Sequence, residues 1–467
     1  MPTPFHAARW ADLAAMLSAP GGVVAAAEQS LAAIEASRAS NAYRIVKPER
    51  VRAEAAAAQA RRDVDAGAPP LTGLPVSAKD LYVVEGYDTF AGTTRALDEK
   101  FPGEGHVVRA LRDAGCVITG KTHTVEFAFG GIGTNPHYPT PVNPWSGGTE
   151  RVSGGSSSGA GVSLWTGTAA LALGSDTAGS VRVPASFTGC IGLKTTHGRW
   201  PIDGIVPLSE SLDTAGVLAL DAGVVAAAFK AIDPVVRRDP GFVARAWPGR
   251  VQGLKLGVVR QAFDDAEPGI AEAVEQALKE LEAAGAVLSD VLLPEVADAL
   301  ELFQVGGVAG MEFAANVNNR FPEWRADLDP NVLQRFAAIE QAPAVEYLRR
   351  LDALAAMEAS AARRMDEACV DALVGPTVPI APPTVQEVAE GKRYVNRNML
   401  ALRNTVVGNF LKLCGFTIPA GLDAQGLPVG LQVMARTGAD IYAVGLLLAV
   451  EAVLGRPVDR LGKPPVA

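Results

Sequence analysis

The spacing of hydrophobic and polar positions along this chain predicts alternating helices and strands. Apolar residues recur at helical spacing, often among alanines and spaced charges, in Val23–Ala39, Glu49–Ala66, His106–Ala114, Val224–Ile232, Pro268–Ala284, Glu301–Arg320, Ala344–Ala368, Ala401–Leu413 and Ile441–Leu454. Short apolar runs bounded by glycine, proline or charge predict strands at Leu74–Ala78, Cys116–Thr119, Ala169–Leu173, Leu254–Val259, Gly415–Pro419 and Val429–Met434. This alternation predicts an α/β fold: a mixed, mostly parallel, twisted β-sheet core with helices on both faces.

Composition and charge restrict the class of protein. The chain has 467 residues, 48% of them hydrophobic and 20% charged, as in ordinary globular proteins. Its net charge is −9 and no basic cluster stands out, which argues against nucleic acid as a main partner. No run of about 20 apolar residues occurs, so we expect no membrane span. Asp12 interrupts the apolar part of the N-terminal segment, unlike a signal peptide, and a cytoplasmic location is therefore expected.

Cysteine and histidine spacing gives no sign of a metal site. The four cysteines, Cys116, Cys190, Cys369 and Cys414, are scattered and form no CxxC pair. None of the five histidines lies in an HxxxH or HExxH pattern. We therefore expect neither a metal nor another cofactor.

One segment imitates a phosphate-binding loop. Gly115–Thr122 matches the pattern GxxxxGK[ST] letter for letter. In a genuine loop of this kind, a strand precedes the first glycine and the middle residues form a turn. Here a predicted helix precedes Gly115, and Cys116–Thr119 is apolar and β-branched, so a strand is expected instead of a nucleotide site.

The segment Gly154–Ala185 holds two glycine-rich turns, one carrying Ser156 and the other Ser180. Glycine allows sharp turns and close approach of backbone N–H groups to a ligand. Several such groups beside a hydroxyl would suit an oxyanion hole next to a nucleophile. Ordinary surface loops have the same composition, so these residues alone leave both interpretations open.

A lysine at the end of a buried strand is unusual. Lys79 follows the predicted strand Leu74–Ala78, and lysine is rarely buried without a partner. One interpretation is a salt bridge to Asp80 or another carboxylate. The other is a desolvated, neutral amine acting as a base, because burial lowers the pKa of lysine.

Four ordered motifs together resemble the amidase-signature family of hydrolases. They are GLPVSAKD from Gly73 to Asp80, GGSSSGAG with GSDTAGSVRVPASFTGCIGLKTTHG in 154–198, DALVGPTVP from Asp371 to Pro379, and GLPVGLQ from Gly426 to Gln432. The resemblance spans roughly Asn41 to Glu451. It implies the amidase-signature fold as a single domain over 1–467, with a catalytic core at about 60–220. A variable helical region at about 225–370 is expected to line the substrate pocket.

The resemblance also implies a Ser–Ser–Lys mechanism. Ser180 is then the nucleophile, and Ser156 passes its proton to neutral Lys79 and later protonates the leaving amine. The family likeness implies a cis peptide bond between Gly155 and Ser156. His123 and His197 are interpreted as structural, as is Lys194.

Further residues take roles by the same likeness. Backbone N–H groups of an oxyanion hole are expected at Thr177, Ala178, Gly179 and Ser180. Supporting hydrogen bonds are expected from Ser157, Asp176 and Arg182, although a plain structural Asp–Arg clamp fits equally well. Gly130 and Gly131 are expected to line the pocket. Ala178 and Ser158 stand where many relatives have glycine, and neither change removes a reacting group.

These residues favour hydrolysis of a small-molecule amide through a serine acyl-enzyme. An alternative is the catalytic chain of a tRNA-dependent glutamine amidotransferase, which would need partner chains. A urea- or carbamate-directed hydrolase and a non-catalytic binding protein are further alternatives. The family likeness also makes a homodimer possible.

Overall fold

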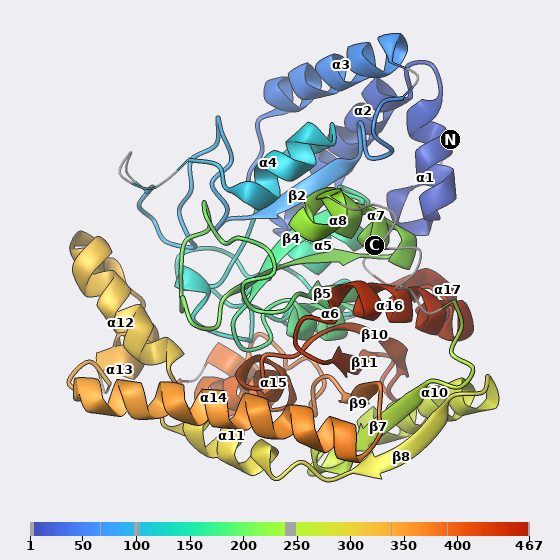
Figure 1. Ribbon diagram of the computed structural model, residues 1–467. Helices are drawn as coiled ribbons and strands as arrows, with labels where there is room; N and C mark the ends of the chain where they lie inside the picture. The colour runs from blue at the N-terminus through green and yellow to red at the C-terminus, as the bar shows by residue number, and fades with distance from the viewer. Residues whose placement is uncertain are drawn as a thin grey trace.

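The computed structural model describes residues 4–65, 67–97, 101, 103–238, 249–337, 339–389 and 391–465. A single 11-stranded sheet forms its core, in the order β1-β3-β2-β4-β6-β5-β10-β11-β9-β7-β8 (Figure 1). The strands are β1 Tyr43–Ile45, β2 Pro75–Lys79, β3 Val117–Thr122, β4 Leu171–Asp176, β5 Ile191–Lys194, β6 Thr214–Ala219, β7 Lys255–Val259, β8 Val287–Val291, β9 Ala372–Pro376, β10 Cys414–Leu422 and β11 Pro428–Ala435.

The sheet is mixed, as predicted, but the expected excess of parallel pairs is wrong. Parallel neighbours are β2–β3, β2–β4, β7–β8 and β7–β9. The other described pairs are antiparallel and outnumber them. Parallel strands need a crossover, usually a helix. Between β5 and β6 no helix occurs in the described chain, and β10 and β11 form a hairpin, so these strands return antiparallel.

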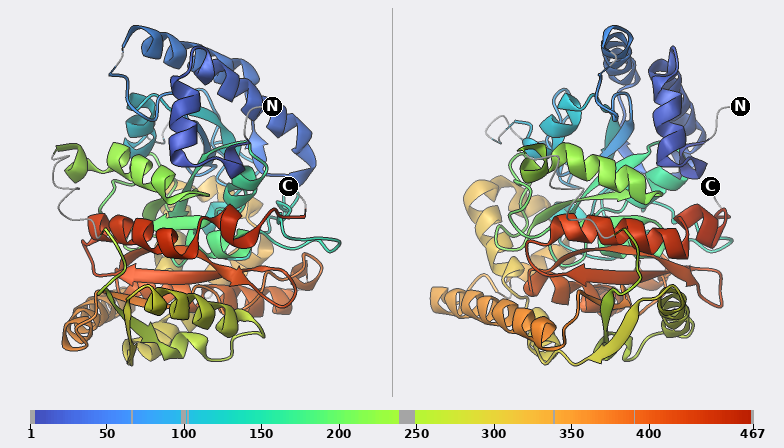
Figure 2. Two further views of the ribbon diagram at one scale, coloured as in Figure 1. Left: turned by 90° about the vertical axis from the view of Figure 1, so that its right-hand side faces the viewer. Right: turned by 45° about the vertical axis from the view of Figure 1, so that its right-hand side comes forward.

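Helices cover both faces of the sheet, as predicted (Figures 1 and 2). They are α1 Trp10–Ser18, α2 Gly22–Ala36, α3 Pro48–Val64, α4 His106–Asp113, α5 Ala160–Trp165, α6 Arg182–Thr188, α7 Ala222–Ile232, α8 Pro234–Arg238, α10 Ile270–Ala283, α11 Glu295–Gln304, α12 Ala309–Arg320, α13 Pro330–Ala337, α14 Ala344–Glu367, α15 Gly391–Phe410, α16 Asp440–Leu454 and α17 Pro457–Leu461. In one series α4, α7, α16 and α10 pack successively, and in another α5, α6, α15, α11 and α14 do so.

One predicted helix is broken in the structure. The expected helix Glu301–Arg320 consists of α11, which ends at Gln304, and α12, which begins at Ala309. Gly306 and Gly307 lie between them with φ of 89° and 58°. This left-handed backbone is accessible to glycine and incompatible with a continuous right-handed helix, so the chain turns here.

The segment that imitates a phosphate-binding loop is a strand. Gly115 follows α4, and Val117–Thr122 forms β3 between β1 and β2. Lys121 is buried and pairs with Asp80, with 2.8 Å between Nζ and Oδ1. The pattern therefore reflects sheet structure, as the apolar residues predict.

The segment Asp440–Leu461 is long and apolar enough, by length and composition alone, to cross a membrane. In the fold its helix α16 packs against α7, α10 and β10. Core packing therefore accounts for its apolar character.

Candidate active site

Lys79 lies at the end of β2 with no exposed surface. Its Nζ is 2.7 Å from Ser156 Oγ and 3.0 Å from Ser175 Oγ. The alternative of a salt bridge to Asp80 is wrong, because Asp80 pairs with Lys121. Burial lowers the pKa of Lys79 to about 7, although the negative charges of Asp213 and Asp176 act to raise it. A substantial fraction of this amine is therefore uncharged near neutral pH.

Ser156 lies in the glycine-rich turn that precedes α5. The peptide bond between Gly155 and Ser156 is cis, as the family resemblance implies. The Ser156 carbonyl accepts hydrogen bonds from the Val125 amide at 3.1 Å and the Thr124 hydroxyl at 3.0 Å. These bonds fix the backbone of the turn, so that the Ser156 hydroxyl faces the Lys79 amine.

Ser180 lies in the second turn, between β4 and α6. Its carbonyl accepts hydrogen bonds from Ser157 Oγ at 2.6 Å and from the Ser157 amide at 3.3 Å. Ser157 thus makes supporting hydrogen bonds, as predicted, and these bonds hold the two turns together. Among the described residues no hydrogen bond joins the Ser180 hydroxyl to Ser156. The two turns are linked by the bonds that the Ser157 hydroxyl and amide donate to the Ser180 carbonyl.

Asp176 and Arg182 brace the Ser180 turn as a buried pair. Arg182 Nη2 lies 3.0 Å from Asp176 Oδ1, and both side chains have no exposed surface. Asp176 Oδ2 also accepts the Val181 amide at 3.1 Å. Although burial alone would raise it, the pKa of Asp176 falls to about 2 because of the charge and hydrogen bonds of Arg182. Arg182 extends the network to Gln432 and Asn409.

The expected set of four oxyanion donors needs one correction. The Gly179 amide donates to Asp176 Oδ1 at 2.8 Å and is therefore occupied. In the described chain no hydrogen bond occupies the amides of Thr177, Ala178 or Ser180. The carboxylate that braces the turn takes the Gly179 donor, so the unoccupied members of the predicted set are the other three amides.

A cavity of about 460 Å³ opens beside Ser180, within the range of about 300–1,000 Å³ that small-molecule sites occupy. Its lining is mostly apolar and comprises Ala128, Phe129, Gly130, Thr177, Ala178, Ser180, Leu208, Leu212, Phe303, Gln304, Val305, Gly306, Gly307, Ala309, Arg335, Ile339, Val395, Asn398, Met399, Leu402 and Phe410. Of the described residues in the predicted variable region, only those from Phe303 to Ile339 line the cavity. Strands β7 and β8 belong to the sheet, and α10 packs against it. Helix α15 supplies a further wall.

The two glycines expected at the pocket differ. Gly130 lines the cavity, whereas Gly131 is not part of the lining. The Gly131 amide donates to Asn398 Oδ1 at 2.7 Å, and its carbonyl accepts the Gly155 amide at 2.7 Å. Gly131 therefore ties the pocket loop to α15 and to the Ser156 turn.

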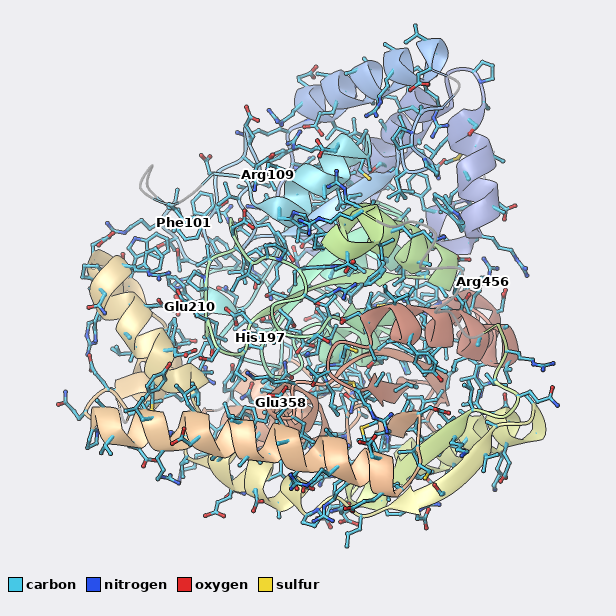
Figure 3. All side chains as sticks on the ribbon, in the orientation of Figure 1. Phe101, Arg109, His197, Glu210, Glu358 and Arg456 are labelled. Carbon is cyan, nitrogen blue, oxygen red and sulfur yellow. The ribbon has the colours of Figure 1, made fainter. Side chains whose placement is uncertain are left out.

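The residues interpreted as structural do not enter the site. His123 is buried, and burial lowers its pKa to about 4. The His197 ring lies 2.9 Å from the carbonyl of Glu210, both labelled in Figure 3, and His197 is not among the residues that line the cavity. Lys194 donates to the carbonyls of Thr195 and Leu413 at 2.8 Å, which supports its structural interpretation.

Sequence reasoning missed several residues of the site. Ser175 contacts the Lys79 amine and directly precedes Asp176 in the motif, so its position was a usable signal. Asp213 accepts a hydrogen bond from the Thr177 hydroxyl at 2.5 Å, and burial raises its pKa to about 6. Asn398 and Arg335 lie in segments without a recognisable motif and reach the cavity only through the tertiary fold.

The fold and this site place the chain among the hydrolases that act on carbon–nitrogen bonds. The chain belongs to the amidase family, whose model matches residues 25–442. A 2-amino-5-chloromuconic acid deaminase of Comamonas testosteroni is 48% identical over 425 residues, which cover 91% of each chain. The A chain of the glutamyl-tRNA(Gln) amidotransferase of Geobacter metallireducens is 32% identical over 458 residues, covering 87% of this chain and 91% of its own.

Solved structures show the same relationship. A crystal structure described as an amidase superposes with a TM-score of 0.81 at 28% identity, covering 93% of this chain and 96% of its own. A protein from a study of an s-triazine catabolic enzyme superposes with a TM-score of 0.83, also at 28% identity, covering 96% and 99%.

Proposed function

We propose that this chain hydrolyses a linear amide of a small molecule through an acyl-enzyme on Ser180. The observation that carries the proposal is the buried Lys79 amine, 2.7 Å from the Ser156 hydroxyl and with its pKa lowered to about 7. A serine hydroxyl is a weak nucleophile until a base accepts its proton. Neutral Lys79 supplies that base without any histidine.

The first step transfers a proton along three groups. Ser180 Oγ attacks the amide carbon while its proton passes to Ser156 Oγ, and the Ser156 proton passes to the Lys79 amine. This route needs the Ser180 hydroxyl to turn toward Ser156, a rotation about one staggered side-chain bond. Such contacts often form only when substrate is bound. The bonds from the Ser157 hydroxyl and amide to the Ser180 carbonyl hold the two turns together and support this route.

The next steps use the free amides of the Ser180 turn. The carbonyl oxygen becomes an oxyanion, stabilised by the Thr177, Ala178 and Ser180 N–H groups. The tetrahedral adduct collapses as Ser156 returns a proton to the leaving nitrogen, which departs as an amine or ammonia. Water then attacks the acyl-enzyme through the same relay and releases the carboxylic acid.

A second candidate reaction follows from one relative. The 48% identical protein is named as a deaminase of 2-amino-5-chloromuconic acid. Removal of an amino group also requires a proton on the departing nitrogen, and the Lys79–Ser156 pair would supply it. Because amidotransferase chains are among the relatives, a glutamine-dependent role that requires partner chains is an alternative proposal for this chain. Hydrolysis of a urea or carbamate remains a further proposal, as does action in the cytoplasm.

Covalent labelling tests the nucleophile. A fluorophosphonate should add to Ser180, as shown by a mass shift on the peptide that contains it. Ser180→Ala should lose both the label and amide hydrolysis while keeping the wild-type circular dichroism spectrum. The matched control is Ser158→Ala in the neighbouring turn, because the buried Ser158 hydroxyl has no hydrogen-bond partner among the described residues. Turnover near wild type in Ser180→Ala would exclude this nucleophile.

A substrate comparison separates the two candidate reactions. Ammonia release is measured from linear amides and from 2-amino-5-chloromuconic acid. Activity on the amides, lost in Ser180→Ala, supports the amidase. Activity confined to the muconic acid would favour the deaminase instead.

A further inference from the structure

The candidate substrate cavity has an unbalanced charge content. Among the described residues that line it, Arg335 carries a positive charge and none is an aspartate or glutamate. Asn398 and Gln304 contribute neutral amide groups to the cavity wall. Most of the other lining residues are aliphatic or aromatic. Within the described wall, Arg335 is therefore the charged group that a substrate entering the cavity would meet.

Contacts with the pocket loop hold Arg335 in position. Its guanidinium carbon lies 4.2 Å from the centroid of the Phe129 ring, and Nη2 donates to the Phe129 carbonyl. The Tyr394 ring lies on another side, 6.0 Å from the guanidinium carbon. Burial lowers the pKa of Arg335, but arginine still remains charged in proteins. The cation is thus fixed at the wall instead of extending into solvent.

Two acidic groups whose charges act on Arg335 lie outside the described cavity wall. Glu126 accepts hydrogen bonds from His137 Nε2 and from the Asp329 amide, both at 2.8 Å. The charges of Asp329 and Glu126 act on Arg335, yet neither residue contributes to the cavity wall. Inside the cavity, therefore, an anionic group meets a positive charge and a cationic group meets no carboxylate.

We infer that Arg335 binds a carboxylate on the substrate, and that the cavity selects amides with an anionic end and no ammonium group. This inference rests on the proposed function, since it assigns the substrate class of the same site. The apolar wall around Phe303, Leu402 and Phe410 contacts the carbon chain between the two ends. Arginine suits this role because its planar fork of N–H groups matches a carboxylate.

The same charge content opposes glutamine as a substrate. On binding, the ammonium group of glutamine would lose its hydration and enter a cavity whose described wall offers no carboxylate. Burying a charge without a partner costs free energy. A dicarboxylic acid monoamide avoids this cost. The inference thus separates this chain from a glutamine-dependent role by the charge of the substrate.

Three amides test the charge preference in the wild-type enzyme. Adipamic acid, hexanamide and 6-aminohexanamide share one carbon chain and end in a carboxylate, a methyl group and an ammonium. We expect kcat/KM to fall in that order, with adipamic acid about 10- to 100-fold above hexanamide, as a hydrogen-bonded charge pair predicts. Equal values for the three amides, or a preference for the ammonium, would overturn the inference whatever the variants show.

Variants of Arg335 identify the residue responsible. Arg335→Gln should raise KM for adipamic acid about tenfold or more and leave hexanamide nearly unchanged, whereas Arg335→Lys should restore part of the preference. Arg335→Glu should reverse the order and favour 6-aminohexanamide, an outcome that loss of a structural contact would not produce. The matched control is Arg349→Gln on α14, a residue that is 64% exposed and pairs with Glu346 outside the cavity.

The failures of the two proposals are distinguishable. If no amide is hydrolysed, or if Ser180→Ala remains active, the proposed function fails. If amides are hydrolysed through Ser180 but Arg335→Gln changes all three substrates alike, the proposed function stands and the assignment of Arg335 is overturned.

Discussion

The protonation of one side chain governs the proposed chemistry. Lys79 lies in a pocket without exposed surface, where its nearest hydrogen-bond partners are the hydroxyls of Ser156 and Ser175. Hydroxyl groups compensate poorly for the lost hydration of an ammonium, so burial favours the neutral amine and lowers its pKa to about 7. The neighbouring buried Lys121 contacts Asp80 directly and so remains part of an ion pair.

The pH dependence of kcat/KM tests this state of Lys79. Because the neutral amine is the active form, protonation should lower kcat/KM about tenfold per pH unit below an apparent pKa near 7. Above that pH the profile should level off. Lys79→Arg keeps a cation that cannot act as a base, and we expect a loss of about three orders of magnitude or more.

Two results would contradict that prediction. One is a profile that stays flat from acid to alkaline pH. The other is a Lys79→Arg variant with activity close to wild type. Thermal unfolding of the variant serves as the control for an intact fold.

At the scale of elements, the junction of β4 and α6 places the nucleophile. Asp176 ends β4 and Arg182 begins α6, and their ion pair spans the turn that carries Ser180. The Asp176 carboxylate also occupies the Gly179 amide, and Thr405 Oγ1 donates to the Ala178 carbonyl at 2.7 Å. The turn is therefore fixed from β4, α6 and α15 together.

Removing the charge of Asp176 should destabilise the protein. Asp176→Asn leaves the buried Arg182 without its counter-ion, at a cost of about 3–5 kcal/mol in the free energy of unfolding. Urea denaturation measures this cost. The control is Asp459→Asn, because the Asp459 side chain is 46% exposed where it pairs with Arg456, and we expect a change below about 1 kcal/mol. A loss for Asp176→Asn no larger than that of the control would refute the role of the pair.

The pH dependence of this contribution has a definite sign. The folded-state pKa of Asp176 is about 2, below the value of about 3.9 for an unperturbed aspartate. Its stabilising contribution is therefore present above about pH 4 and is lost as the pH falls through 2. The stability difference between wild type and Asp176→Asn should shrink over that range.

At the scale of the whole molecule, segments far apart in sequence converge on one cavity. The proposed catalytic groups come from β2 and from the turns around Ser156 and Ser180, while the opposite wall comes from α11, α13 and α15. One chain thus supplies both the reacting groups and the wall around the substrate. We therefore propose that this arrangement functions without a partner chain.

The purified chain should therefore hydrolyse amides alone. We expect turnover of a linear amide without added proteins, and glutamine to be a poor substrate because the described cavity wall lacks a carboxylate. An ammonia-release assay on the purified chain measures both. Efficient ammonia release from glutamine, or activity only after addition of partner proteins, would contradict the prediction. Light scattering on the same sample distinguishes the 48.5 kDa monomer from the homodimer, which stays a prediction.

The sequence by itself was sufficient to predict the residues at the centre of the candidate site. Lys79, Ser156 and Ser180 stand in local motifs of glycine, serine and small residues, and the backbone of a turn depends mainly on its own residues. The mixed sheet with helices on both faces also followed from the local periodicity. Strand direction did not, because a connection without a helix, as between β5 and β6, leaves the return path to long-range packing.

Only the tertiary structure decided which groups meet. The loss of Gly179 as a donor, the contact of Ser175 with Lys79 and the place of Arg335 at the cavity all depend on distances between separate segments. Arg335 lies on α13, more than a hundred residues after Ser180, and no local pattern marks it. The burial of Lys79 also depends on the tertiary structure. The whole surrounding fold desolvates its amine, whereas the sequence shows only that a lysine is present.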